Sequence, residues 1–245
     1  MSSRDVSQDV QFEDERIRRA YAKRERRYSH FDPSHSVAVY EVETQLLKLL
    51  RRKNRTDLSS YKILEVGCGS GYWLRRMMEW GAAPANLFGV DLLNERIAAA
   101  RDRSPQGTTL ICGSAAELEF KDGYFDIVAQ FTMFSSILDR PARKKIAAEM
   151  LRVVKPTGLI IWVDFFVRNP RNPDVRGIRK SEIAELFPGS EISLKRIWLA
   201  PPIASAIAPY SQIMCTALSR MPMLCTHYLG AIEKCPGLET PGNGG

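Results

Sequence analysis

Apolar positions along this chain recur first with a helical spacing and then in short uninterrupted runs. From 37 to 53 they fall at every third or fourth position, which predicts an amphipathic helix. The short runs predicted as strands are 62–66, 87–91, 108–112, 125–130 and 159–165. The segments predicted as helices between them are 70–80, 94–103 (with Asn94 as its N-cap) and 140–154. This alternation is typical of an α/β fold, a mainly parallel sheet with helices on both faces.

The two ends of the chain follow other patterns. Segments 191–198 and 224–233 alternate as strands do, and the apolar stretch 200–222 between them predicts a partly helical lid. Segment 12–28 is charged and helix-prone. No repeat or linker divides the chain, so we predict one domain. Its parts are a disordered start (1–10), a domain (11–235) containing a helical cap (11–56), a core (60–166) and a lid (200–222), and a disordered tail (236–245).

Composition changes this picture little, with 44% hydrophobic and 26% charged residues. No apolar run reaches the roughly 18 residues that span a bilayer, and the N-terminus lacks a secretory apolar centre, so we expect a cytoplasmic protein. Five scattered cysteines without Cys-x-x-Cys spacing predict neither a metal site nor disulfides. The net charge of +7 is partly concentrated in 16–27 and near Arg55. Interspersed acidic residues favour a solvated helix face there over a nucleic-acid patch.

The strongest candidate site is the segment EVGCGSG at 65–71, which follows a predicted strand and opens a helix. Glycines at such a turn let the backbone approach a ligand closely, and the amides of the helix start favour polar or anionic groups. Asp91 ends the next predicted strand, where a carboxylate can bind both hydroxyls of a ribose. Tyr72 stands where a dinucleotide-binding motif has its third glycine, which disfavours NAD or FAD.

Four segments together resemble the type 11 superfamily of class I methyltransferases over residues 60–166: ILEVGCGSG, GVDLLNERIAAAR, GSAAELEFKDGYFDIV and EMLRVVKPTGLIIWVDF. The resemblance implies S-adenosylmethionine as cofactor. It also implies a Rossmann-like seven-stranded sheet in the order 3-2-1-4-5-7-6, with its last strand antiparallel. The whole chain is also similar to bacterial methyltransferases found among polysaccharide and secondary-metabolite genes.

The same resemblance implies roles for residues of this chain. Those expected to line the cofactor, chiefly its methionine portion, are Glu65, Gly67, Cys68, Gly69 and Gly71. Asp91 is expected at the ribose of the cofactor. The residues expected at the adenine are Leu92, Ser114, Ala115 and Ala116, and those expected at the sulfonium are Gln130 and Phe131. The sequence departs from the family twice. Ser114 replaces an aspartate that usually binds the adenine amine, and no histidine follows the fourth predicted strand.

Methyl transfer to a hydroxyl also requires removal of a proton, and two residues are candidate bases. Asp164 ends the fifth predicted strand, with a loop-capping role as the alternative, and His227 lies near the end of the chain, where a structural role is the alternative. Tyr21, Arg24 and Tyr28 share one helix face that could hold the cofactor carboxylate and exclude water, unless that helix is merely amphipathic. Phe134, Ser135 and Arg168 are candidate acceptor contacts, although Arg168 also suits a solvated loop.

These features favour O-methylation of a small molecule, such as a sugar or natural product, in an enclosed pocket. An RNA or protein methyltransferase is the first alternative, but the chain has neither an NPPY-like segment after the fourth predicted strand nor a Pro-Cys nucleophile. A catalytically silent cofactor-binding partner protein is the second. A nicotinamide oxidoreductase conflicts with the glycine spacing. The sequence leaves the oligomeric state open.

Overall fold

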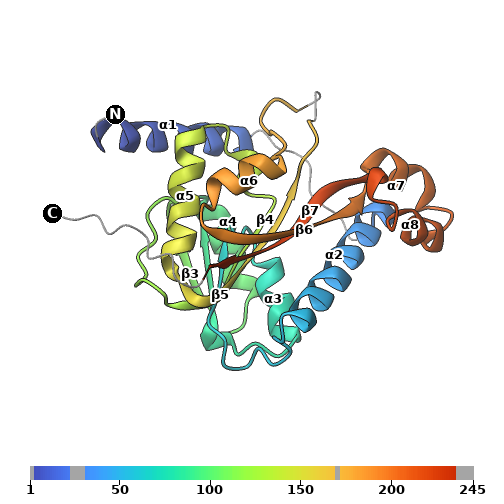
Figure 1. The fold of residues 1–245 in the computed structure, drawn as a ribbon, viewed down its shortest axis with the longest axis horizontal. Helices are drawn as coiled ribbons and strands as arrows, with labels where there is room; N and C mark the ends of the chain where they lie inside the picture. Colours follow the sequence, from blue (N-terminus) through green and yellow to red (C-terminus); the bar gives the residue numbers. More distant parts are fainter. Residues whose placement is uncertain (1–2, 23–30, 169–171, 236–245) are drawn as a thin grey trace.

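The central sheet has seven strands in the order β3-β2-β1-β4-β5-β7-β6, which confirms the predicted topology (Figure 1). The strands are β1 (Ile63–Val66), β2 (Leu87–Asp91), β3 (Thr109–Cys112), β4 (Phe125–Phe131), β5 (Val154–Phe165), β6 (Ser190–Leu199) and β7 (Cys225–Lys234). Neighbouring strands are parallel except that β7 runs antiparallel to β5 and β6. This computed structural model describes residues 3–22, 31–168 and 172–235.

Helices cover both faces of the sheet. They are α1 (Ser3–Ala22), α5 (Arg140–Val153) and α6 (Lys180–Leu186) on one face, and α2 (Pro33–Arg52), α3 (Tyr72–Glu79) and α4 (Asn94–Arg103) on the other (Figure 1). Side chains alternate between the faces along each strand. In β5, Trp162 therefore packs under α5 and α6, whereas Ile161 and Val163 belong to the core under α2 and α3.

Most predicted elements lie within a few residues of the observed ones, and three differences have physical reasons. The helix predicted through 154 gives way to β5 at Val154, because Val154 pairs with Phe125 before the register shifts near Ile127. Helix α1 begins at Ser3, inside the stretch predicted to be disordered, and Val10 is buried in the core. Leu93, not Asn94, is the N-cap of α4.

The predicted lid forms a lobe of short helices between β6 and β7. It contains α7 (Pro201–Ile207), α8 (Gln212–Leu218) and the 3₁₀ turn η3 (Pro222–Leu224). This lobe lies against the N-terminal end of α2, on the opposite side of the molecule from α1 (Figure 1). No helix in the described ranges is both long and apolar enough to cross a membrane.

Candidate functional site

The glycine-rich loop leaves the sheet at its centre, between β1 and α3. Val66 pairs with Val90 of β2 and with Gln130 of β4, so the carboxyl ends of these three strands lie side by side. Ligands bind at such strand ends in open α/β sheets. Gly67, Gly69 and Gly71 have φ values of 72°, 54° and 73°, a left-handed backbone that side-chain-bearing residues rarely adopt. The strained turn exposes the loop backbone at this edge of the sheet.

Asp91 ties this loop to β2. Its carboxylate accepts hydrogen bonds from the backbone N–H groups of Gly69 (2.8 Å) and Leu93 (2.9 Å). The amides of Gly67 and Cys68 in turn donate to the carbonyl of Val90 (2.8 and 3.0 Å). Each carboxylate oxygen of Asp91 keeps one lone pair, so the residue can still accept from a ribose hydroxyl.

Two buried polar atoms beside the loop have no hydrogen-bond partner among the residues that the structure describes. They are the Glu65 Oε2 and Gln130 Nε2 atoms, and both side chains are almost fully buried. Burial, and then the charge of Asp91, raises the pKa of Glu65 well above its ordinary range. Gln130 uses only its oxygen, which accepts from the Met133 N–H (3.0 Å). A buried polar group without a partner is costly, so these atoms indicate a site for a polar ligand.

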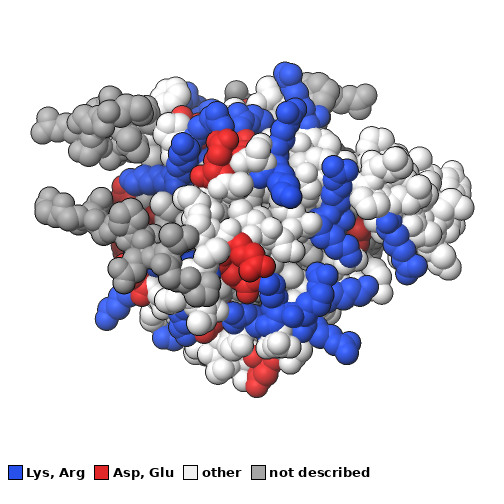
Figure 2. Space-filling model, in the orientation of Figure 1, with Lys and Arg blue, Asp and Glu red and all other residues white. Residues whose placement is uncertain are grey.

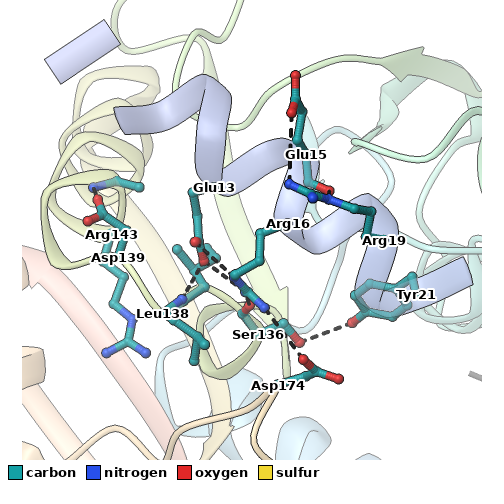
Figure 3. A network of polar contacts seen from close by, with 12 residues as sticks. Glu13, Glu15, Arg16, Arg19, Tyr21, Ser136, Leu138, Asp139, Arg143 and Asp174 are labelled. Atoms are coloured by element: carbon teal, nitrogen blue, oxygen red, sulfur yellow. Dashed lines mark hydrogen bonds and ion pairs between the residues drawn. The ribbon is translucent and has the colours of Figure 1, made fainter. Parts of the chain in front are cut away.

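Helix α1 covers the loop that follows β4, as Figure 3 shows. The buried Glu13 accepts from the Leu138 N–H (2.5 Å), and Arg16 donates to the Ser136 carbonyl (2.5 Å). The Tyr21 hydroxyl lies 3.0 Å from Ser136 Oγ. Charge-assisted bonds of this kind are stronger than neutral ones, so they fix α1 over this edge of the sheet.

Tyr21 also reaches the glycine-rich loop. The Arg96 guanidinium of α4 lies 4.3 Å from the centre of the Tyr21 ring, and Arg96 in turn lies beside Gly69. The structure therefore brings Tyr21 to the candidate site, and Arg96 with it, although no motif marked Arg96. Arg24 and Tyr28, predicted on the same helix face, lie outside the described residues.

The predicted adenine end also meets α1. The Ser114 side chain lies close enough to the carboxylate of Asp14 to lower its pKa, but burial has the larger effect and raises the pKa of that carboxyl. Ser114 and Ala116 line a hollow of about 540 Å³ at the ends of β2 and β3. Ala116, with Ala115 beside it, is part of the apolar core, and Leu92 is half-buried. Asp14 thus supplies a carboxylate where Ser114 lacks one, a contact that sequence reasoning missed.

The two candidate bases do not face the same side of the sheet. Asp164 pairs with Tyr228, whereas His227 pairs with Phe165 one position further along β5. Asp164 is fully buried and accepts from the N–H groups of Ser135 (3.0 Å) and Phe165 (2.9 Å). Burial raises its pKa to about 6. In this structure Asp164 holds the loop after β4 and is closed to an acceptor.

His227 lies on the α2 face of the sheet. Its ring stacks on Trp198 at a centroid distance of 4.2 Å, and Nδ1 is 2.9 Å from the Thr226 hydroxyl. Burial lowers its pKa to about 3, so the ring is neutral at neutral pH. Phe131 faces the same side and stacks on Trp73 of α3 at 4.4 Å. Aromatic rings therefore follow this face from β4 to β7.

The predicted acceptor contacts have other partners here. Phe134 is fully buried against Trp162, with ring centroids 4.6 Å apart, and Ser135 is buried as well. Arg168 is exposed. Sequence reasoning also missed Arg143, a fully buried residue of α5 that donates to the Ile137 carbonyl (2.6 Å) and pairs with Glu182 (2.5 Å). No motif marks such a contact, because its partners are distant in sequence.

Part of the chain is similar to known methyltransferases. Residues 63–158 match the family model described as a methyltransferase domain. Demethylmenaquinone methyltransferase of Anoxybacillus flavithermus is 25% identical over 158 residues, which cover 63% of this chain and 64% of that protein. The chain thus spans less than two thirds of the length of this relative.

Two solved structures share the fold. An S-adenosylmethionine-dependent methyltransferase from Mesorhizobium loti is 17% identical, with a TM-score of 0.54, covering 76% of this chain and 96% of that one. Phosphoethanolamine N-methyltransferase 2 from Haemonchus contortus, in complex with S-adenosylmethionine, is 19% identical, with a TM-score of 0.56, covering 78% of this chain and 53% of that one. The match over residues 63–158 is to a methyltransferase domain, and the strand order is the one predicted for a class I methyltransferase fold.

Proposed function

We propose that this chain, which carries a class I methyltransferase domain, transfers a methyl group from S-adenosylmethionine to a small-molecule acceptor. The observation that carries the proposal is a pair of buried atoms, Glu65 Oε2 and Gln130 Nε2, that no described residue bonds, next to a loop with three left-handed glycines. When bound, the cofactor would supply an electrophilic methyl group on a positively charged sulfur, with the neutral thioether as its leaving group.

The residues of this chain bind and orient the cofactor in this proposal. Asp91 accepts hydrogen bonds from the ribose hydroxyls while it keeps the glycine-rich loop in place. The carboxylate of Asp14 and the hydroxyl of Ser114 lie at the adenine end. Helix α1, fixed by Glu13, Arg16 and Tyr21, keeps water away from that side. Alignment of the reactants is the main contribution that an enzyme makes to such a reaction.

The acceptor that the site fits best is planar and already acidic. Asp164 is sealed, and a histidine with a pKa of about 3 is a weak base at neutral pH. Both facts favour a hydroxyl that ionises without help, such as a phenol or enol, over a sugar hydroxyl. The aromatic face formed by Trp73, Phe131 and Trp198 suits a flat ring. Within O-methylation of a small molecule, we therefore favour an aromatic natural product.

Two observations bear on the other candidates. The name of the Anoxybacillus relative makes a demethylated quinone a second acceptor to test. An RNA or protein acceptor and a silent cofactor-binding role remain the alternatives to be tested against these. The predicted cytoplasmic location stays a prediction.

The first experiment is calorimetric titration with S-adenosylhomocysteine, with NADH as the comparison ligand. We expect micromolar binding of S-adenosylhomocysteine alone, lost in Asp91→Ala and kept in Asp57→Ala, a matched change in an exposed loop. Radiolabelled S-adenosylmethionine is then offered with phenols, hydroxyquinones, sugars and RNA. Absence of binding would refute the proposal, whereas binding without transfer to any acceptor class would favour the silent partner protein.

A further inference from the structure

The lobe between β6 and β7 carries large apolar side chains on its outer surface. We call residues 201–224, which comprise α7, α8 and η3, the tip. Tyr210, Ile213 and Met223 of the tip are 90%, 84% and 77% exposed, and Met214 and Met221 are exposed as well. Monomeric proteins rarely place so many large apolar side chains together in water, so this surface is built to be covered.

The tip buries only part of its large apolar side chains. Its fully buried residues are the small Ala204, Ala208 and Cys215, in a cluster with Val37 and Leu199. The larger Ile203, Ile207, Leu218 and Leu224 pack against this cluster and are partly buried. Burying the larger Ile213 or Met223 would stabilise the fold more, since the free energy gained grows with the apolar area removed from water. The outward position of these residues therefore has no explanation in the stability of the tip itself.

The tip and the strand that leads into it carry basic side chains. Residues 192–232 contain no Asp or Glu, whereas Lys195, Arg196 and Arg220 are exposed. Arg220 belongs to the tip, and Lys195 and Arg196 lie on opposite faces of β6. Asp32, the N-cap of α2, is an exposed acidic residue beside the tip. Arg220 lines a groove of about 570 Å³ between α8 and α2, together with Tyr40 and Ile213. In Figure 2 the lobe at the position of α7 and α8 is white, with Lys and Arg side chains and a smaller acidic patch beside it. An apolar surface with a basic border complements an anionic lipid surface.

We propose that the tip docks on the surface of a membrane that contains anionic lipids. The outward Ile213, Met214 and Met223 enter the boundary of the acyl chains, and Tyr210 lies at the level of the headgroups. Arg220 contacts the lipid phosphates, and the positive charge of Lys195 and Arg196 adds to the attraction at longer range. A second copy of the chain is a poorer occupant, because two such basic borders repel each other. The docking surface does not depend on which acceptor is methylated.

The experiment measures sedimentation of the purified chain with vesicles of phosphatidylcholine alone or mixed with phosphatidylglycerol. We expect binding to the mixed vesicles that weakens as salt is raised. Ile213→Glu and Met223→Glu should each weaken it at least about tenfold, since each removes an apolar anchor from the lipid. Arg220→Gln should weaken binding to mixed vesicles by about fivefold, the share of one basic side chain.

Leu47→Glu is the matched control, because Leu47 is 45% exposed on α2 outside the tip. It should bind vesicles as the unchanged chain does. Thermal unfolding of every variant separates lost docking from lost folding, and it requires no cofactor. Failure of the chain to bind mixed vesicles, or equal binding by the Ile213→Glu variant and the Leu47→Glu control, would overturn the proposal. If the Ile213→Glu or Met223→Glu variant changes its oligomeric state but binds vesicles as the unchanged chain does, the proposal is also overturned. The tip would then be a contact surface between copies of the chain.

Discussion

Substitution of Asp164 by Asn tests the account of the sealed carboxyl at the end of β5. The side chain is fully buried, and burial raises its pKa from the ordinary 3.8 to about 6. The native state therefore takes up a proton at a higher pH than the unfolded chain. The free energy of unfolding of the unchanged protein should gain about 2.5 kcal/mol from this group as the pH falls from about 8 to 4. Asp164→Asn cannot show this gain.

A second effect of the substitution does not depend on pH. An Asn side chain can accept from only one of the Ser135 and Phe165 amides, so it should cost about 1–3 kcal/mol at every pH. We therefore expect the two proteins to be nearly equal in stability at pH 8, because relief of the buried charge offsets the lost bond. At pH 4 the variant should be clearly less stable.

The assay is urea denaturation of both proteins across this pH range, with the difference in free energy of unfolding as the readout. Asp57→Asn is the matched control: Asp57 is exposed, and hydrogen bonds from Ser59 lower its pKa. Its difference curve should be nearly flat over most of this pH range. It should slope in the opposite direction only when the measurement is extended below about pH 4, because the native carboxylate is favoured and that advantage is lost as the pH falls through a folded pKa below 3.8. A flat Asp164 curve, or one with the slope of Asp57, would refute the reasoning and would mean that Arg143 and the two amides hold Asp164 ionised.

Three further predictions concern the cofactor site. Tyr21→Phe should weaken S-adenosylhomocysteine binding by roughly two- to tenfold in calorimetry, since the variant loses the hydrogen bond to Ser136 but keeps the ring beside Arg96. Unchanged affinity would mean that the position of α1 does not affect cofactor binding. Asp14→Asn should reduce the preference for S-adenosylhomocysteine over its inosine analogue, which lacks the adenine amine. An unaltered preference would mean that Asp14 does not contact the adenine amine. Gly67→Ala should lower thermal stability by at least about 1–2 kcal/mol, because φ is 72° and the new Cβ would lie 2.7 Å from Met133 Cγ. Adding Met133→Ala to Gly67→Ala should restore only the part of the lost stability that is due to this contact. Full restoration would mean that an alanine adopts the left-handed backbone at position 67 without cost.

The parts of the fold that follow from local patterns could be predicted. β2 and α4 have the predicted bounds, because an uninterrupted apolar run and a helical repeat each indicate one structure. The glycine-rich loop could be placed for the same reason, since strand, glycines and helix are contiguous. Only the resemblance to a family supplied the order of the strands, because apolar patterns do not say which strands are neighbours.

Contacts between distant segments could not be predicted. Whether Asp164 and His227 share a face depends on the register between β5 and β7, and a slip of one residue would reverse it. Asp14 lies a hundred positions before Ser114 in the chain, so only the docking of α1 brings them together. Glu13 and Arg16 look like ordinary charges of a solvated helix until Leu138 and Ser136 become their partners.

The contacts around the loop after β4 also restrict how an acceptor reaches the cofactor. The backbone of residues 135–138 is bonded by Asp164 of β5, Arg16 and Glu13 of α1, and Arg143 of α5. Three elements must separate before a molecule can enter from that face. On the other face, Trp73 and Trp198 are only partly buried, and the Thr132 backbone (φ 55°) turns the chain directly after Phe131. We therefore expect the acceptor to approach between the sheet and α2. The tip packs against the same helix, so a chain that is docked on a membrane through its tip would present this entrance to an acceptor that arrives from the lipid.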